Sequence, residues 1–126
     1  MKVFGEVGSK HEKNAAEELV MQARDCMNAG AELLIVEGAE LVENGAIKPD
    51  MVQSLKAALD ADRMMVELIG PWIAGVTQSH VHELKRLLIS EFGPDVNLGN
   101  VMPDDLFETE MSRLGVGVSQ PLKRTW

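Results

Sequence analysis

The stretch Phe92–Met102 reads F-G-P-D-V-N-L-G-N-V-M, and the interpretation of the whole chain starts from it. Its Gly-Pro pair ends the preceding helical pattern, because proline cannot continue a helix. A very short apolar run follows and carries Asn97 and Asn100, with Gly99 between them. Pro103 and the two acids after it suit the first turn of another helix. The stretch therefore predicts a strand that feeds a helix through a glycine-containing turn, with polar side chains at the strand's carboxyl end.

Three earlier stretches have the same layout, and each carries a glutamate at or near the end of its apolar run. They are Lys2–Val7 with Glu6, Leu33–Glu37, and Met64–Leu68 with Glu67. The second is apolar at every position before its glutamate, which is typical of a parallel strand buried on both faces.

Apolar residues recur at three- and four-residue steps between these runs, as expected for helices. The predicted helices are Asn14–Asn28, one that begins at Pro49, Ser79–Glu91, and one over about Pro103–Leu114. In the last we expect Leu106, Phe107, Met111 and Leu114 on the buried face. Four strand-helix units in succession predict an α/β fold with a parallel sheet. A small open sheet and part of a (β/α) barrel both fit, and in both the ligands bind at the carboxyl ends of the strands.

Length and composition set the broad class. The chain has 126 residues, so we expect one domain over 1–126, with a mobile tail over 115–126 where no pattern is visible. A net charge of -8 and a pI of about 4.8 argue against nucleic-acid and anionic-membrane partners. The single cysteine, Cys26, excludes an intrachain disulfide. With no signal-peptide pattern and no membrane-spanning run, the sequence predicts a soluble cytoplasmic protein.

Glu6, Glu37 and Glu67 are the candidate metal ligands, and Asn97 is expected at the equivalent place in the fourth unit. A single acid at a strand end is most often a surface residue. Several at equivalent places predict a shared polar site, because parallel strands end at the same edge of a sheet. Oxygen ligands without a His/Cys cluster favour a hard ion such as Mg²⁺.

Lys10 follows Gly8 in the loop after the first predicted strand. A lysine near carboxylates can act as an acid-base group or bind a substrate anion, although a loop lysine is more often solvated. Glycines follow the strand ends, where backbone N–H groups can hold phosphate, although glycines also simply make turns. They are Gly8, Gly38, Gly70 and Gly99. His80 and His82 do not share a helix face, so a metal-binding histidine pair is not expected.

Several stretches together resemble the phosphosulfolactate synthase family of coenzyme M biosynthesis. They are E-V-G-S-K (Glu6–Lys10), A-G-A-E-L-L-I-V-E (Ala29–Glu37), the strand around Glu67, and above all G-P-D-V-N-L-G-N-V (Gly93–Val101). They occur in the family's order and spacing, to about Gly117. The resemblance implies a TIM-type (β/α)₈ barrel and a Mg²⁺-dependent carbon-sulfur lyase that adds sulfite to phosphoenolpyruvate.

The family's members are about twice as long, and this chain resembles their carboxyl-terminal half. The resemblance therefore implies four βα units that form half of a barrel. Because four strands leave two open edges, we expect self-association into a homo-oligomer, a partner that carries the other half-barrel, or a truncated form.

The resemblance also suggests roles for individual residues. Lys10 falls on the second lysine of the family's E-V-G-K-K pattern and would be the general acid, while Ser9 replaces the first lysine. Glu6, Glu37 and Glu67 would hold Mg²⁺. The substrate, a small anion, would be bound by Asn97, Asn100, Gly70, Gly99 and Arg113.

Two expected arginines are absent. Glu37 and Glu40 match the glutamates of the family's E-A-R-E-S-G stretch, but Ala39 replaces the arginine. The arginine expected shortly after Arg113 is also missing. Two alternatives therefore stay open, namely a divergent lyase that acts on another small carboxylate and a non-catalytic half-barrel that serves as an assembly partner.

Overall fold

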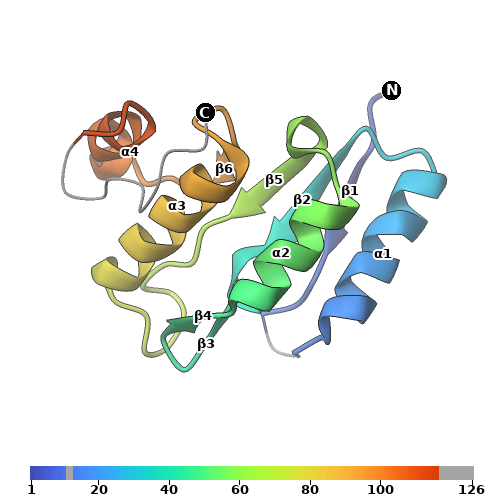
Figure 1. Ribbon diagram of the computed structural model, residues 1–126, viewed down its shortest axis with the longest axis horizontal. Helices are drawn as coiled ribbons and strands as arrows, with labels where there is room; N and C mark the ends of the chain where they lie inside the picture. The colour runs from blue at the N-terminus through green and yellow to red at the C-terminus, as the bar shows by residue number, and fades with distance from the viewer. Residues whose placement is uncertain (11–12, 117–126) are drawn as a thin grey trace.

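A computed structural model describes residues 1–10 and 13–116 and shows an α/β fold (Figure 1). The main sheet has four parallel strands in the order β1-β2-β5-β6, and a helix follows each strand along the chain. The strands are β1 (Phe4–Val7), β2 (Leu33–Glu37), β5 (Met64–Glu67) and β6 (Asn97–Gly99); the helices are α1 (Ala16–Asn28), α2 (Pro49–Ala58), α3 (Gln78–Phe92) and α4 (Leu106–Arg113). The predicted α/β class and parallel sheet are confirmed, and the arrangement is consistent with part of a TIM-type barrel. Residues 117–126 of the predicted mobile tail lie outside the described residues.

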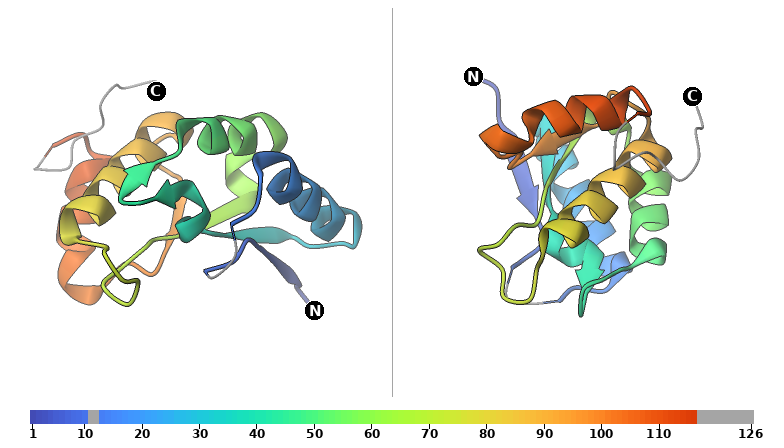
Figure 2. Two further views of the ribbon diagram at one scale, coloured as in Figure 1. Left: turned by 90° about the horizontal axis from the view of Figure 1, so that it is seen from below. Right: turned by 90° about the vertical axis from the view of Figure 1, so that its left-hand side faces the viewer.

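The two faces of the sheet differ in how they are covered. Helices α1, α2 and α3 pack on one face (Figure 2). The strand side chains on that side are buried; they are Val7, Leu34, Val36, Met64 and Val66. Because side chains alternate along a strand, Glu6, Glu37 and Glu67 all lie on the other face. None of the helices in the described ranges has the length and apolarity that crossing a membrane requires.

A two-stranded hairpin lies between β2 and α2. A 3₁₀ turn (Gly38–Leu41) leads into β3 (Val42–Glu43), which pairs with β4 (Ala46–Ile47). Asn44 and Gly45 form the turn and both have positive φ, at 50° and 77°. An Asn-Gly pair between two short strands is a strong hairpin signal, because this two-residue turn needs positive φ at both positions.

The prediction for the buried face of the last helix is wrong. Leu106, Phe107 and Leu114 of α4 are exposed, whereas Thr109 and Ser112 are buried. The helix therefore docks on the fold through its polar side.

Lys85 of α3 explains this orientation. Its side chain is fully buried, and its Nζ donates to Asp105 Oδ2 at 2.8 Å, to Thr109 Oγ1 at 3.0 Å and to the Glu108 carboxylate. His82 Nε2 lies 3.5 Å from Asp105 Oδ1. A buried ammonium must be paired, and the acids of the 103–108 segment supply the pairs.

Candidate active site at the strand ends

Three glutamates from three neighbouring strands form an acidic cluster. Glu6 of β1, Glu37 of β2 and Glu67 of β5 each offer a carboxylate oxygen, and these oxygens all lie within 4.8 Å of one another. The burial of these residues increases from the exposed Glu6 through the partly buried Glu67 to the buried Glu37. The parallel register produces this grouping, since it places Glu37 beside Glu67 at the carboxyl end of the sheet. We call these residues the glutamate cluster.

Glu37 is the best-anchored member of the cluster. Its Oε1 accepts the N–H of Ala39 at 3.2 Å, and its Oε2 lies 3.5 Å from Nζ of Lys10. Among the described residues, Glu6 and Glu67 have no ion pair of this kind. Three carboxylates share one ammonium, so the cluster keeps an excess of negative charge at short range. An all-oxygen donor set with uncompensated charge fits a hard divalent cation such as Mg²⁺.

Two glycines allow the chain to pack closely against Glu67. A Cβ atom on Gly38 would lie 2.0 Å from the Glu67 carbonyl oxygen, which the backbone cannot accommodate. Gly99 of β6 is the register partner of Glu67, and a Cβ there would lie 3.4 Å from Cγ of Glu67. Gly38 is thus required for the close approach of the two backbones at Glu67, whereas a side chain at Gly99 would only touch the Glu67 side chain. At Gly70 the equivalent space is filled by the ring of Trp72.

The loop that carries Lys10 is held by Glu40, which is fully buried. The Glu40 carboxylate accepts the N–H of Ser9 at 2.8 Å, the N–H of Asn14 at 3.1 Å and the side-chain amide of Asn14. The N–H of Gly8 donates to Gln22 Oε1 at 3.2 Å. Hydrogen bonds to a carboxylate are stronger than neutral ones, so Glu40 fixes the loop on both sides of Lys10. From the sequence, Glu40 was only matched to a glutamate of the family's E-A-R-E-S-G stretch. Its role in holding the loop around Lys10 was not predicted.

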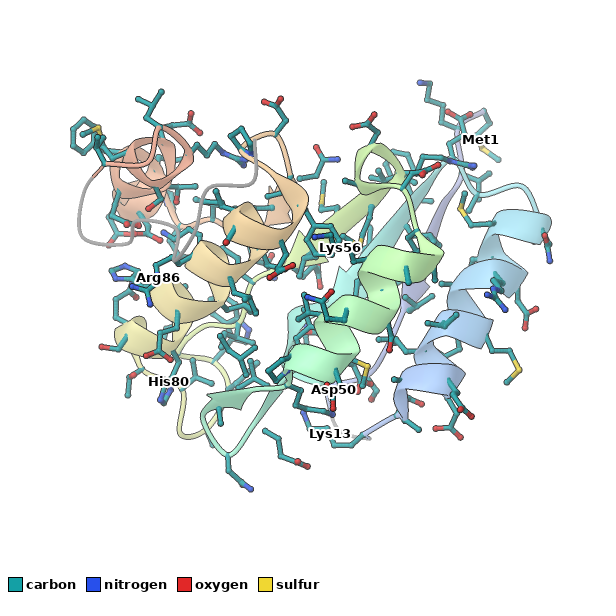
Figure 3. All side chains as sticks on the ribbon, viewed as in Figure 1. Met1, Lys13, Asp50, Lys56, His80 and Arg86 are labelled. Carbon is teal, nitrogen blue, oxygen red and sulfur yellow. The ribbon has the colours of Figure 1, made fainter. Side chains whose placement is uncertain are left out.

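A pocket of about 540 Å³ adjoins Lys10 on the side of the β3–β4 hairpin. Its basic lining residues are Lys10, Lys13 and His80, and Figure 3 shows the labelled Lys13 and His80 on either side of the hairpin. The Lys13 ammonium donates to the carbonyls of Ala39 and Val42, so its bonds within residues 1–10 and 13–116 leave one N–H for a ligand. His80 accepts the N–H of Thr77 through Nδ1, so the proton of its neutral ring is on Nε2. Glu43 of the hairpin lines the pocket as well, so two ammonium groups face one carboxylate there, and Lys10 joins the pocket to the glutamate cluster. The excess of positive groups suits a small anion.

Two predicted substrate-binding side chains are not brought to the cluster. The Asn97 amide donates to the Met64 carbonyl at 3.0 Å, where β5 begins. The guanidinium of Arg113 donates to the carbonyls of Val96, at 2.8 Å, and Pro94, just before β6. Both side chains thus stabilise the amino-terminal end of the sheet. Asn100 is exposed directly after β6, with φ of 57°.

A second acidic group consists of His82, Asp105 and Glu108, whose ligand atoms also lie within 4.8 Å of one another. Here the fully buried Lys85 Nζ is in contact with both carboxylates, whereas in the glutamate cluster the half-exposed Lys10 pairs, among the described residues, with Glu37 alone. We therefore interpret it as an ion-pair network that attaches α4 to α3.

Comparison with known proteins agrees with these observations. A protein named "Phosphosulfolactate synthase" from Methanothermobacter thermautotrophicus is 29% identical to this chain over 125 residues. The alignment covers 90% of this chain and 44% of the relative, so the chain spans less than half of that protein's length. The model of the family described as ComA, (2R)-phospho-3-sulfolactate synthase, matches residues 1–118. This match covers nearly the whole sequence, and the chain therefore belongs to the ComA phosphosulfolactate synthase family.

Proposed function

We propose that this protein is a Mg²⁺-dependent carbon-sulfur lyase that joins sulfite to phosphoenolpyruvate to form phosphosulfolactate. The observation that carries the proposal is the glutamate cluster with Lys10 3.5 Å from Glu37, in a chain of the ComA family. The name of the methanogen relative supports the choice of reaction.

Glu6, Glu37 and Glu67 would hold the Mg²⁺ ion, directly or through water. The bound ion would stabilise the negative charge that develops on the substrate carboxylate during the reaction. Because Glu37 lies 3.5 Å from Lys10 Nζ and within 4.8 Å of the other two acids, it would set the position of Lys10 relative to the ion.

Lys10 would supply the proton that completes the addition. The sulfur lone pair of sulfite forms a bond to C3 of phosphoenolpyruvate, and the electrons of the C2–C3 double bond move towards C2 and the carboxylate. The Lys10 ammonium then donates a proton to C2, which gives phosphosulfolactate and a neutral amine. The pocket lined by Lys10, Lys13 and His80 would hold the anionic groups of the substrate.

One observation favours a second candidate. Ala39 stands where the family resemblance leads one to expect an arginine, and the guanidinium of Arg113 is bound to backbone carbonyls. A site with few arginines has less capacity to bind a phosphate and a carboxylate together. The second candidate is therefore a lyase that uses the same glutamates and Lys10 on another small carboxylate.

Phosphorus NMR of the purified protein with phosphoenolpyruvate, sulfite and Mg²⁺ tests the reaction. We expect a new phosphoester signal that needs all three components and is abolished by EDTA. The omission of sulfite is the control, because enol phosphate hydrolysis would give only inorganic phosphate. The proposed reaction is wrong if the folded protein gives no new signal, either alone or with the amino-terminal half of the methanogen relative added. Sulfite-dependent turnover of another unsaturated carboxylate, followed by proton NMR, would then support the second candidate.

A further inference from the structure

Helix α4 exposes an apolar stripe. Leu106, Phe107 and Leu114 lie within about 100° of one another around the helix axis, at about 100° per residue. The last two are 77% and 70% exposed, while Thr109 and Ser112 on the opposite side are buried. A surface helix normally turns its apolar side to the core. Among the described residues nothing covers this stripe, so a further partner surface is expected there.

The opposite end of the sheet has a matching exposed surface. Strand β1 is an edge strand, and Phe4 on it is 57% exposed, next to the exposed Val3. Phe4 lies on the face that no described helix covers, together with its register partner Leu33, and Ile35 and Met65 follow on the same face. Parallel sheets are normally covered on both faces, and open edges attract further strands.

The two exposed surfaces belong to opposite flanks of one chain. The strand order β1-β2-β5-β6 puts β1 at one edge and β6, with α4 after it, at the other. Figure 1 shows α1 and α4 at opposite ends of the molecule. One rotation can therefore satisfy both flanks, provided that the β1 flank of each copy meets the α4 flank of the other.

We infer that two copies of this chain form a twofold symmetric dimer in which β1 of each copy lies beside β6 of its partner. Four strands from each copy then close an eight-stranded parallel barrel, which has no open edge. A second copy is favoured as the occupant because both complementary flanks are present on this chain.

The arrangement affects the candidate site. Glu6 is on the edge strand β1 and is exposed, so in the dimer it would lie next to the end of the partner's β6. The side of the glutamate cluster that is open in one chain would then be closed by Gly99 and Asn100 of the partner subunit. The inference does not depend on the reaction, because it rests on the two flanks alone.

Light scattering with size-exclusion chromatography tests the dimer. We expect wild-type protein at micromolar concentration to show about twice the chain mass of 13.8 kDa. Phe4→Glu and Phe107→Glu should each give a monomer with an unchanged circular dichroism spectrum, because both side chains are exposed in one chain. Met21→Glu is the matched control. Met21 of α1 is also exposed, but it lines a groove together with Ser54 of α2 and is not part of either flank. The dimer should therefore persist in this variant.

A mixing experiment tests the pairing of the flanks. A mixed dimer of Phe4→Glu and Phe107→Glu chains has both substitutions in one interface and leaves the other interface wild-type. We therefore expect the mixture to recover dimer that neither variant forms alone. A wild-type monomer would overturn the inference, and so would a dimer that is lost with Phe107→Glu but unaffected by Phe4→Glu, because that result indicates an α4-to-α4 contact.

Discussion

Replacement of Lys10 by alanine is expected to lower the turnover of phosphoenolpyruvate and sulfite by about 10²- to 10⁴-fold, the usual contribution of a general acid. The expectation follows from its position 3.5 Å from Glu37, at the edge of the glutamate cluster and of the adjoining pocket. Turnover is measured by phosphorus NMR at saturating substrate. Lys56→Ala is the matched control. Lys56 lies in the last turn of helix α2 (Figure 3), where it pairs with Glu91 at 3.1 Å and not with a glutamate of the cluster.

Lys10→Arg separates proton donation from charge. Arginine keeps the positive charge but stays protonated, so it can bind an anion without acting as an acid. We expect Lys10→Arg to bind phosphoenolpyruvate nearly as well as the wild-type protein and still to lose turnover. If Lys10→Arg turned over substrate at close to the wild-type rate, Lys10 would be an anion-binding residue and another group would supply the proton.

Replacement of Lys85 by methionine is expected to lower the free energy of unfolding by about 3–5 kcal/mol, the cost typical of removing one partner of a buried ion pair. Lys85 is fully buried and bonded to Asp105, Glu108 and Thr109. Methionine fills much of the same volume, so the loss comes mainly from two carboxylates that are left together without a cation.

Urea denaturation, followed by circular dichroism, measures this effect. Lys56→Met is the control and should change the unfolding free energy by less than about 1 kcal/mol, because its ion pair is partly solvated. The addition of Asp105→Asn and Glu108→Gln to Lys85→Met should recover much of the loss, since the repulsion is then removed. A loss below about 1 kcal/mol for Lys85→Met would show that α4 is not held by this network.

The sequence was sufficient to predict the class of fold and the grouping of three glutamates at the strand ends. Strand-helix alternation is visible in the apolar periodicity, and parallel strands end at one edge of a sheet. The gathering of Glu6, Glu37 and Glu67 follows from these two facts. The position of Asn97 does not follow from them. Strand β6 is only three residues long, and its register places Gly99, two residues after Asn97, beside Glu67.

The sequence did not reveal where charges are buried. Lysines and glutamates are usually solvated, so nothing in the pattern marks Lys85 or Glu40 as fully buried. The orientation of α4 depends on the buried Lys85. Because the burial of Lys85 could not be predicted, the apolar residues of α4 were expected to face the core. Their exposure is informative only in the folded structure, where it marks the flank that we propose is covered by a second copy.

Mn²⁺ binding, followed by the electron paramagnetic resonance signal of free Mn²⁺, tests whether the glutamate cluster is a cation site. Mn²⁺ shares the preference of Mg²⁺ for carboxylate oxygen. We expect about one Mn²⁺ site per chain, from which Mg²⁺ displaces the Mn²⁺. Glu37→Gln should weaken it by at least about tenfold, since even the loss of a residue that only orients a metal ligand costs about 10- to 100-fold. Glu17→Gln, on the exposed first turn of α1, should leave binding unchanged. Equal Mn²⁺ affinity in wild-type and Glu37→Gln protein would contradict the assignment of the glutamate cluster as the cation site.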